Sequence, residues 1–239
     1  MDAYNALAKF YEHLQQSENY DKWAKFIVKS LSKTPNNVGV DVGAGTGLIT
    51  RALAENGFVV TGTDVSFDML NEAVNLSDGQ IPYIRQSAEN FSGFTDLGFV
   101  TAVNDVVNYL SPKKVEAFFT KVFNALSSGG VFLFDVSSVY KLKNLLGNET
   151  FCMDTDEVSY MWFNTLKKDR VIMDITVFQP TDDGLYERFD EKHVQYLHET
   201  DFIKDLLFKI GFKSVVVKGH LGSKLTDDSL RIVFLAKKL

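Results

Sequence analysis

A glycine-rich loop followed by an acidic residue is the part of this sequence whose residue types and spacing point most directly to chemistry. Gly43, Gly45 and Gly47 stand where an apolar run gives way to a helical pattern. Residues without a Cβ atom let the backbone approach a ligand closely at such a turn. Asp64 ends the next apolar run, and a right-handed crossover would bring its carboxylate beside the loop. A carboxylate there can accept two hydrogen bonds from a ribose diol, so the pattern predicts a nucleoside site.

The spacing of these glycines narrows the class of nucleotide. Dinucleotide-binding loops need glycines at relative positions one, three and six, so that a helix N-terminus meets the pyrophosphate. Here the glycines fall at one, three and five, and Leu48 occupies the sixth position. No Gly-Lys-Ser/Thr follows the loop, as a Walker phosphate loop would require. The loop therefore favours a nucleoside ligand without phosphates.

Residues with acid–base or metal-binding chemistry are sparse elsewhere. His193 could act as a general base toward an amine or a hydroxyl, and it shares a charge-alternating run with Arg188. Such a run is also typical of the solvent side of a sheet. Cys152, the single cysteine, has no histidine beside it and is expected to be an inert thiol. One cysteine and four histidines, none of them at metal-ligand spacing, predict no metal site.

Alternating strand and helix patterns position the glycine loop. Several strand-like runs are apolar throughout, which is typical of a parallel sheet covered by helices on both faces. Two amphipathic helical segments, residues 3–14 and 20–31, precede the first of these strands. The expected strands are 38–42, 58–63, 81–85, 99–103 and 131–136. Three helices are expected between them: one at 48–55, one capped by Ser66, and one that begins at Ser111-Pro112 and runs to about residue 126.

The pattern changes after about residue 157. Three strand-like runs, 158–166, 171–178 and 186–196, are joined by short turns and must therefore be antiparallel. A helix from Thr200 and a final strand pair, 213–218 and 230–236, follow them. The sequence therefore predicts an α/β fold with a Rossmann-like, mostly parallel sheet of about seven strands, a C-terminal antiparallel hairpin and an inserted antiparallel cap. The expected divisions are 1–136 for the core with its N-terminal helices, 137–198 for the cap, and 199–239 for the helix and hairpin that complete the core.

Composition excludes several classes of protein. Twenty-five Lys and Arg against 31 Asp and Glu leave a net charge of −6, which argues against a general nucleic-acid binder. No apolar stretch approaches the roughly 20 residues that span a bilayer, and the N-terminus lacks the pattern of a secretory signal. The expectation is a cytoplasmic protein without nucleic-acid or membrane partners, which is a monomer or a homodimer.

The run Asp41–Gly47 resembles the first motif of class I S-adenosylmethionine (SAM)-dependent methyltransferases, with Ala44 where the usual form has cysteine. By this resemblance Asp64 binds the ribose, Val65 and Met69 flank the adenine, and 86–89 contact the adenine edge. The run 104–110 resembles the fourth motif, where the methionine part of SAM meets the acceptor. The resemblance implies SAM as cofactor, S-adenosylhomocysteine as product, and no metal. The cofactor-binding residues it implies are Tyr4, Tyr20, Trp23, Asp41, Gly43, Ala44, Gly45, Thr46, Gly47, Asp64, Val65, Met69, Ser87, Ala88, Glu89, Asn104, Asp105 and Asn108.

Three further segments, 4–12, 20–23 and 188–193, resemble one bacterial subgroup of these enzymes. Its members carry an antiparallel insertion over the active site and are similar to sugar-N- and glycine-N-methyltransferases. The resemblance implies methyl transfer to a nitrogen or oxygen of a small molecule, with Tyr11, Arg188 and His193 as the catalytic candidates.

Two other functions stay open at this point. One is an NAD(P)-dependent oxidoreductase on a related fold, which Leu48 and the terminal hairpin disfavour. The other is a non-catalytic SAM-binding module that regulates a partner. The inserted cap is expected to be an acceptor-binding lid, and its alternative is a dimerisation surface with an exposed aromatic face.

Overall fold

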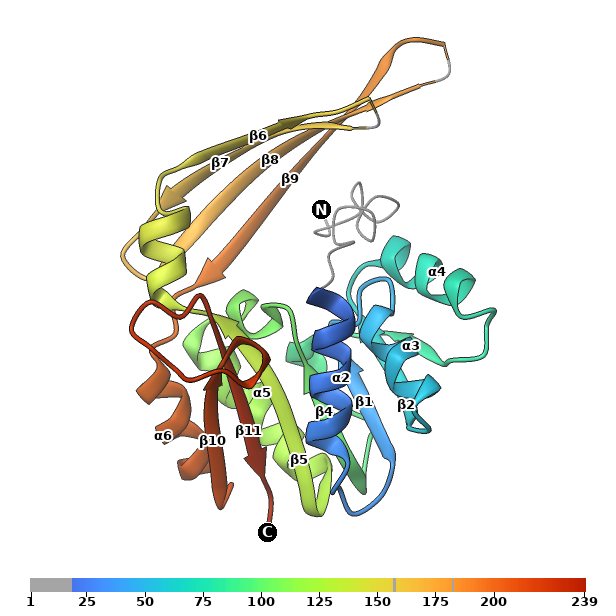
Figure 1. Ribbon diagram of the computed structural model, residues 1–239, viewed down its shortest axis with the longest axis vertical. Coiled ribbons are helices and arrows are strands. Elements are labelled where there is room, and N and C mark those ends of the chain that lie inside the picture. The colour runs from blue at the N-terminus through green and yellow to red at the C-terminus, as the bar shows by residue number, and fades with distance from the viewer. Residues whose placement is uncertain (1–18, 157, 182) are drawn as a thin grey trace.

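The computed structural model describes residues 19–156, 158–181 and 183–239, and a seven-stranded sheet forms its centre (Figure 1). The strand order is β10-β11-β5-β4-β1-β2-β3. Strands β1 to β5 run parallel, and β11 lies antiparallel to both β5 and β10. The predicted Rossmann-like sheet with a C-terminal hairpin is confirmed. Its strands are β1 (Val38–Val42), β2 (Val59–Asp64), β3 (Tyr83–Arg85), β4 (Leu97–Ala102), β5 (Leu126–Ser137), β10 (Ser214–Gly219) and β11 (Arg231–Lys237).

Alternation along β5 divides the core between the two faces of the sheet. Phe132 and Phe134 pack with the residues of α5 and α6, whereas Val131 and Leu133 pack with those of α2 and α3. Successive side chains of a strand point to opposite faces, so a continuously apolar strand needs a helical layer on each side. The helices are α2 (Asn19–Leu31), α3 (Leu48–Glu55), α4 (Phe67–Leu76), α5 (Pro112–Ala125) and α6 (Thr200–Ile210).

A second, four-stranded antiparallel sheet forms the cap, inserted between β5 and α6. Figure 1 shows it beyond the carboxyl ends of the parallel strands. A small apolar cluster lies where the cap joins the core, and its buried residues are Leu142, Val171 and Met173. The cap therefore has hydrophobic packing of its own. The cap strands, in spatial and chain order, are β6 (Thr150–Asp154), β7 (Ser159–Leu166), β8 (Arg170–Pro180) and β9 (Tyr186–Tyr196).

Two elements of the cap were not predicted from the sequence. Strand β6 is short and largely exposed, and its partner β7 supplies the pairing that makes it a strand. The π-helix η3 (Lys141–Leu146) joins β5 to the cap. Of the two predicted N-terminal helices, 3–14 lies outside the described residues and the second is α2. None of the helices in the described part of the chain is long and apolar enough to cross a bilayer.

Candidate functional site

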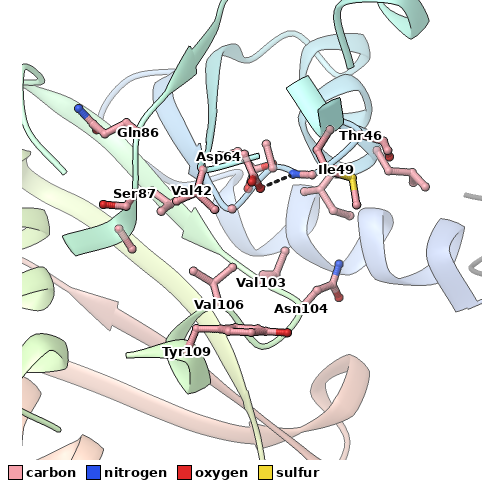
Figure 2. Close-up of a pocket in the computed structure, with 18 of the residues that line it drawn as sticks. Val42, Thr46, Ile49, Asp64, Gln86, Ser87, Val103, Asn104, Val106 and Tyr109 are labelled. Atoms are coloured by element: carbon pink, nitrogen blue, oxygen red, sulfur yellow. Dashed lines mark hydrogen bonds between the residues drawn. The ribbon is translucent and has the colours of Figure 1, made fainter. Parts of the chain in front are cut away.

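A cavity of about 220 Å³ lies at the carboxyl ends of β1, β2 and β4 (Figure 2). Ligands of open α/β sheets bind at this edge, because the loops leaving the strands diverge there. The glycine loop forms one wall, and the 3₁₀ helix η2 (Val106–Tyr109) lies opposite. The structure brings the following sequence-predicted residues together around this cavity: Asp41, Gly43, Ala44, Gly45, Thr46, Asp64, Val65, Met69, Ser87, Ala88, Glu89 and Asn104.

Asp64 is fixed by the glycine loop that it faces. Its Oδ2 accepts a hydrogen bond from the Gly45 amide at 2.9 Å, drawn as a dashed line in Figure 2, and its Oδ1 accepts one from the Ser66 amide at 2.9 Å. Burial raises the pKa of Asp64, and these backbone donors oppose the shift. The carboxylate is thus held at the cavity wall, with lone pairs left to accept hydrogen bonds from a ligand diol.

Asp41 supports the cavity from the end of β1. Its side chain is 2% exposed, and its two oxygens accept hydrogen bonds from the hydroxyls of Thr50 and Thr101, each at 2.7 Å. Burial raises the pKa of Asp41 to about 6 despite these donors. Because Thr50 belongs to α3 and Thr101 to β4, the carboxylate ties three elements together beneath the glycine loop.

The opposite wall consists mainly of residues that the sequence did not single out. Val103 and Val106 give it apolar surface, and the ring of Tyr109 lies along it, whereas Ile49 lies on the side of the glycine loop (Figure 2). The only available signal was the resemblance of 104–110 to the fourth motif. That run contains both cavity-facing and core-facing residues, and no periodicity separates them.

Several predicted cofactor residues have other structural roles. Gly47, with φ of +82°, is the N-cap residue that precedes α3, and an added Cβ would lie 2.3 Å from the Tyr83 hydroxyl oxygen. Trp23 is 3% exposed and stacks on Phe26 within the core, so it does not line the described cavity. Asn108 is fully buried and hydrogen bonded to backbone groups. Tyr4 and Tyr11 lie outside the described residues, as does the side chain of Tyr20.

Asp105 belongs to a charged cluster behind the cavity wall. Asn104 and Asp105 both have left-handed backbone angles, with φ of 63° and 69°, which turn the chain from β4 into η2. The Asp105 side chain accepts a hydrogen bond from Ser137 at 2.9 Å, with Arg231 3.4 Å and Lys141 4.0 Å away. Burial opposes ionisation, but these two cations keep the pKa of Asp105 below its ordinary value. The carboxylate therefore stabilises the junction of β4, β5 and β11 instead of lining the cavity.

The two catalytic candidates on β9 lie in different surroundings. The Arg188 side chain is 60% exposed and pairs with Asp190 at 2.9 Å. The His193 side chain is only 2% exposed and contacts Glu191 and the cavity residue Tyr109. The structure therefore connects His193, but not Arg188, to the described cavity, and a role for Arg188 toward an acceptor stays a prediction.

Comparisons with known proteins agree with this geometry. The family profile described as a methyltransferase domain matches residues 40–130. A protein of Geobacillus sp. (strain WCH70) named "Putative methyltransferase" is 33% identical over 98% of this chain and 99% of its own. The crystal structure of a S-adenosylmethionine-dependent methyltransferase from Clostridium acetobutylicum ATCC 824 has 30% identity and a TM-score of 0.87, with 98% of each chain covered. The sugar N-methyltransferase KedS8 from Streptoalloteichus sp ATCC 53650 shares the fold at 15% identity and a TM-score of 0.77, with 96% of this chain and 91% of that chain covered.

Proposed function

The chain belongs to the SAM-dependent methyltransferases, and from this premise we propose that it transfers a methyl group from SAM to a nitrogen or oxygen of a small molecule. The observation that carries the proposal is the cavity between the glycine loop and η2, with Asp64 fixed on its wall and the cap beyond it. The loop beside this cavity has glycines at relative positions one, three and five, which suits a nucleoside ligand better than a pyrophosphate.

The residues present fit SAM. Asp64 would hold the ribose diol, Val65 and Met69 would flank the adenine, and Asn104 would face the methionine part. The backbone of Gly45 leaves room for close approach, because nothing lies within 4 Å of an added Cβ. When bound, SAM supplies a methyl group already activated by its sulfonium, so the protein has mainly to orient the acceptor and exclude water.

We propose that the cap orients the acceptor. It overhangs the edge of the core that carries the cavity (Figure 1), and β7 to β9 combine aromatic side chains such as Tyr160 and Trp162 with charged ones. The name of KedS8 and the resemblance noted above favour amine acceptors, such as amino sugars. We further propose a cytoplasmic location and a metal-independent reaction.

Isothermal titration calorimetry with SAM, S-adenosylhomocysteine and NADH tests the cofactor. The expected result is binding of the first two and not of NADH, whereas binding of NADH alone would favour the oxidoreductase. Release of S-adenosylhomocysteine from SAM with a panel of glucosamine, glycine and short alcohols then tests the acceptor class. Turnover is expected to continue in EDTA.

Replacement of Asp64 tests the assignment of the ribose. A hydrogen bond to a charged group contributes about 1.5–3 kcal/mol, so Asp64→Ala should weaken SAM at least tenfold by calorimetry. Asp68→Asn removes an exposed carboxylate at the start of α4 and should leave the affinity unchanged. A folded Asp64→Ala protein with less than a twofold change would contradict the ribose assignment.

A further inference from the structure

Three polar side chains connect the buried face of the cap to the cavity. Tyr109 on η2 places its hydroxyl oxygen 3.1 Å from Nδ1 of His193. The other ring nitrogen of His193, Nε2, lies 2.9 Å from Oε2 of Glu191. His193 and Glu191 are neighbours on one face of β9, with side chains 2% and 5% exposed. A carboxylate, an imidazole and a phenol thus form one continuous hydrogen-bonded chain.

The chemistry of the three groups gives this chain a direction. An ionised carboxylate only accepts hydrogen bonds, so Nε2 of His193 must donate to Glu191. In a neutral imidazole the other nitrogen is then an acceptor, so the Tyr109 hydroxyl donates to Nδ1. In this order the Tyr109 oxygen acts as a hydrogen-bond acceptor on its other side, and His193 can take up the proton that Tyr109 gives away.

The chain is anchored where the cap meets η2. The Asn108 amide donates to the Tyr196 carbonyl of β9 at 3.1 Å, and Nε2 of His198 lies 3.2 Å and 3.0 Å from the carbonyls of Val107 and Leu110. The rings of Tyr109 and His193 also pack edge to face, with centroids 6.0 Å apart. These contacts fix the phenol relative to β9, as a group that transfers a proton requires.

Tyr109 is the member of the chain that reaches the cavity. It is half-buried and lines the cavity, while His193 and Glu191 lie behind it. Figure 2 shows its hydroxyl on the side of Asn104, with Gln86 and Ser87 at the opposite end. Under the proposed function, Gln86 and Ser87 belong to the adenine end. The hydroxyl therefore lies toward the end where an acceptor would meet the methyl group.

We infer that Glu191, His193 and Tyr109 form a proton relay in which the Tyr109 oxygen receives the proton of the methyl acceptor. The inference rests on the proposed function. The acceptor's lone pair forms the new bond to the methyl carbon, and the electron pair of the broken carbon–sulfur bond stays on sulfur. The acceptor's proton passes to the Tyr109 oxygen as the phenolic proton passes to Nδ1 of His193. Glu191 stabilises the imidazolium, so Tyr109 is the catalytic residue and the other two are positioning residues.

The protonation pattern is tested by long-range ¹H–¹⁵N NMR on the full-length protein saturated with S-adenosylhomocysteine. The expected spectrum has His193 protonated at Nε2 and bare at Nδ1, with the signals assigned by their loss in His193→Gln. Tyr109→Phe should shift the Nδ1 signal, whereas Tyr140→Phe, on an exposed ring after β5, should not. A proton on Nδ1 of His193, or an Nδ1 signal unmoved by Tyr109→Phe, overturns the relay.

Turnover with the panel of amine and alcohol probes supplies the second measurement. General acid–base groups contribute about 10²–10⁴-fold, so Tyr109→Phe should lower kcat at least about a hundredfold, with a smaller effect on the KM for SAM. Glu191→Gln should lower kcat while the His193 signals remain those of a folded protein. A kcat within threefold of the parent in Tyr109→Phe overturns the relay alone. Failure of SAM to bind the parent protein overturns the proposed function, and the relay with it.

Discussion

The half-buried Asp64 and the buried Asp41 lie near the ends of the neighbouring strands β2 and β1, and their surroundings differ. Asp64 receives backbone donors and faces the cavity, so its charge is available to a ligand. Both carboxylate oxygens of Asp41 accept hydrogen bonds from threonine hydroxyls, and the carboxylate is buried beneath the glycine loop. The same residue type thus presents a carboxylate to the cavity in one place and supports the fold in the other, and the hydrogen-bond partners distinguish the two.

Gly45 offers a test of the loop at the level of one residue. Its φ is +56° and it lines the cavity, so Gly45→Val introduces both a strained backbone and a side chain beside the ligand. We expect SAM binding to be lost in calorimetry. Gly79→Val, at φ of +67° with equally open space, creates a similar strain away from the cavity and should retain affinity. Parent-like binding by a folded Gly45→Val protein would contradict this site.

Asp41 predicts a pH dependence of stability. Its pKa is raised to about 6 in the folded state, so between about pH 4 and 6 the folded protein binds more protons than the unfolded one. The contribution of Asp41 to stability is therefore greatest below this window and is lost as the pH rises through it, by about 1 kcal/mol between pH 5 and 7.5. Asp41→Asn cannot titrate and should lack this fall in urea unfolding. Asp227→Asn, on an exposed loop, should keep it, and identical pH profiles for parent and Asp41→Asn would refute the assignment.

At this scale the sequence predicted those residues of the cavity wall that contribute a backbone segment or an isolated charge. The glycine loop and Asp64 follow from residue types at fixed spacing. Trp23 and Asn108 could not be assigned in this way. The sequence around a tryptophan on a helix, or an asparagine after a strand, is the same whether the side chain packs in the core or lines a site. Tyr109 was not among the predicted site residues, because its contact with His193 joins positions that are distant in the sequence and adjacent only in the fold.

Among the elements, η2 connects the core to the cap, and Asn108 is central to it. Its amide donates to the carbonyls of Ser137 and Tyr196, and its oxygen accepts from the Ser137 amide. A buried polar group that loses its partner costs about 1–3 kcal/mol, so Asn108→Ala should lower the free energy of unfolding by at least about 2 kcal/mol. Urea titration measures the loss, with the exposed Asn56→Ala as control. A loss below 0.5 kcal/mol, on the order of an ordinary surface substitution, would argue against this anchor.

Strong periodicity made most elements predictable, and its absence explains the exceptions. The prediction of 186–196 coincides with β9, and that of 48–55 coincides with α3, because each carries its own pattern and turn signals. Strand β6 has little periodicity of its own. It is a strand because it pairs with β7. The π-helix η3 likewise depends on the junction between β5 and the cap, which no local propensity describes.

The whole molecule consists of a core that carries the cavity and an inserted antiparallel cap. Among the described residues, those that line the cavity all lie between Asp41 and Leu110. The cap contacts this part through η2, by way of His193, Tyr196 and His198. Binding of SAM should therefore depend on the core, whereas the cap should influence the acceptor and the position of Tyr109. This division was predictable as an insertion after β5, but its attachment to η2 was not.

Shortening the distal hairpin of the cap tests that division. Val177 and Phe189 are paired in the register of β8 and β9, so residues 178–188 can be replaced by an Asn-Gly turn that closes the hairpin while leaving Glu191 and His193 in place. Affinity for S-adenosylhomocysteine should stay within twofold by calorimetry, because no described cavity residue is removed. If Arg188 and its neighbours hold the acceptor, turnover with the amine probes should fall. A tenfold loss of affinity in a folded variant would show that the cap holds the cofactor. A change from dimer to monomer by light scattering, with full turnover, would show that this hairpin serves assembly instead.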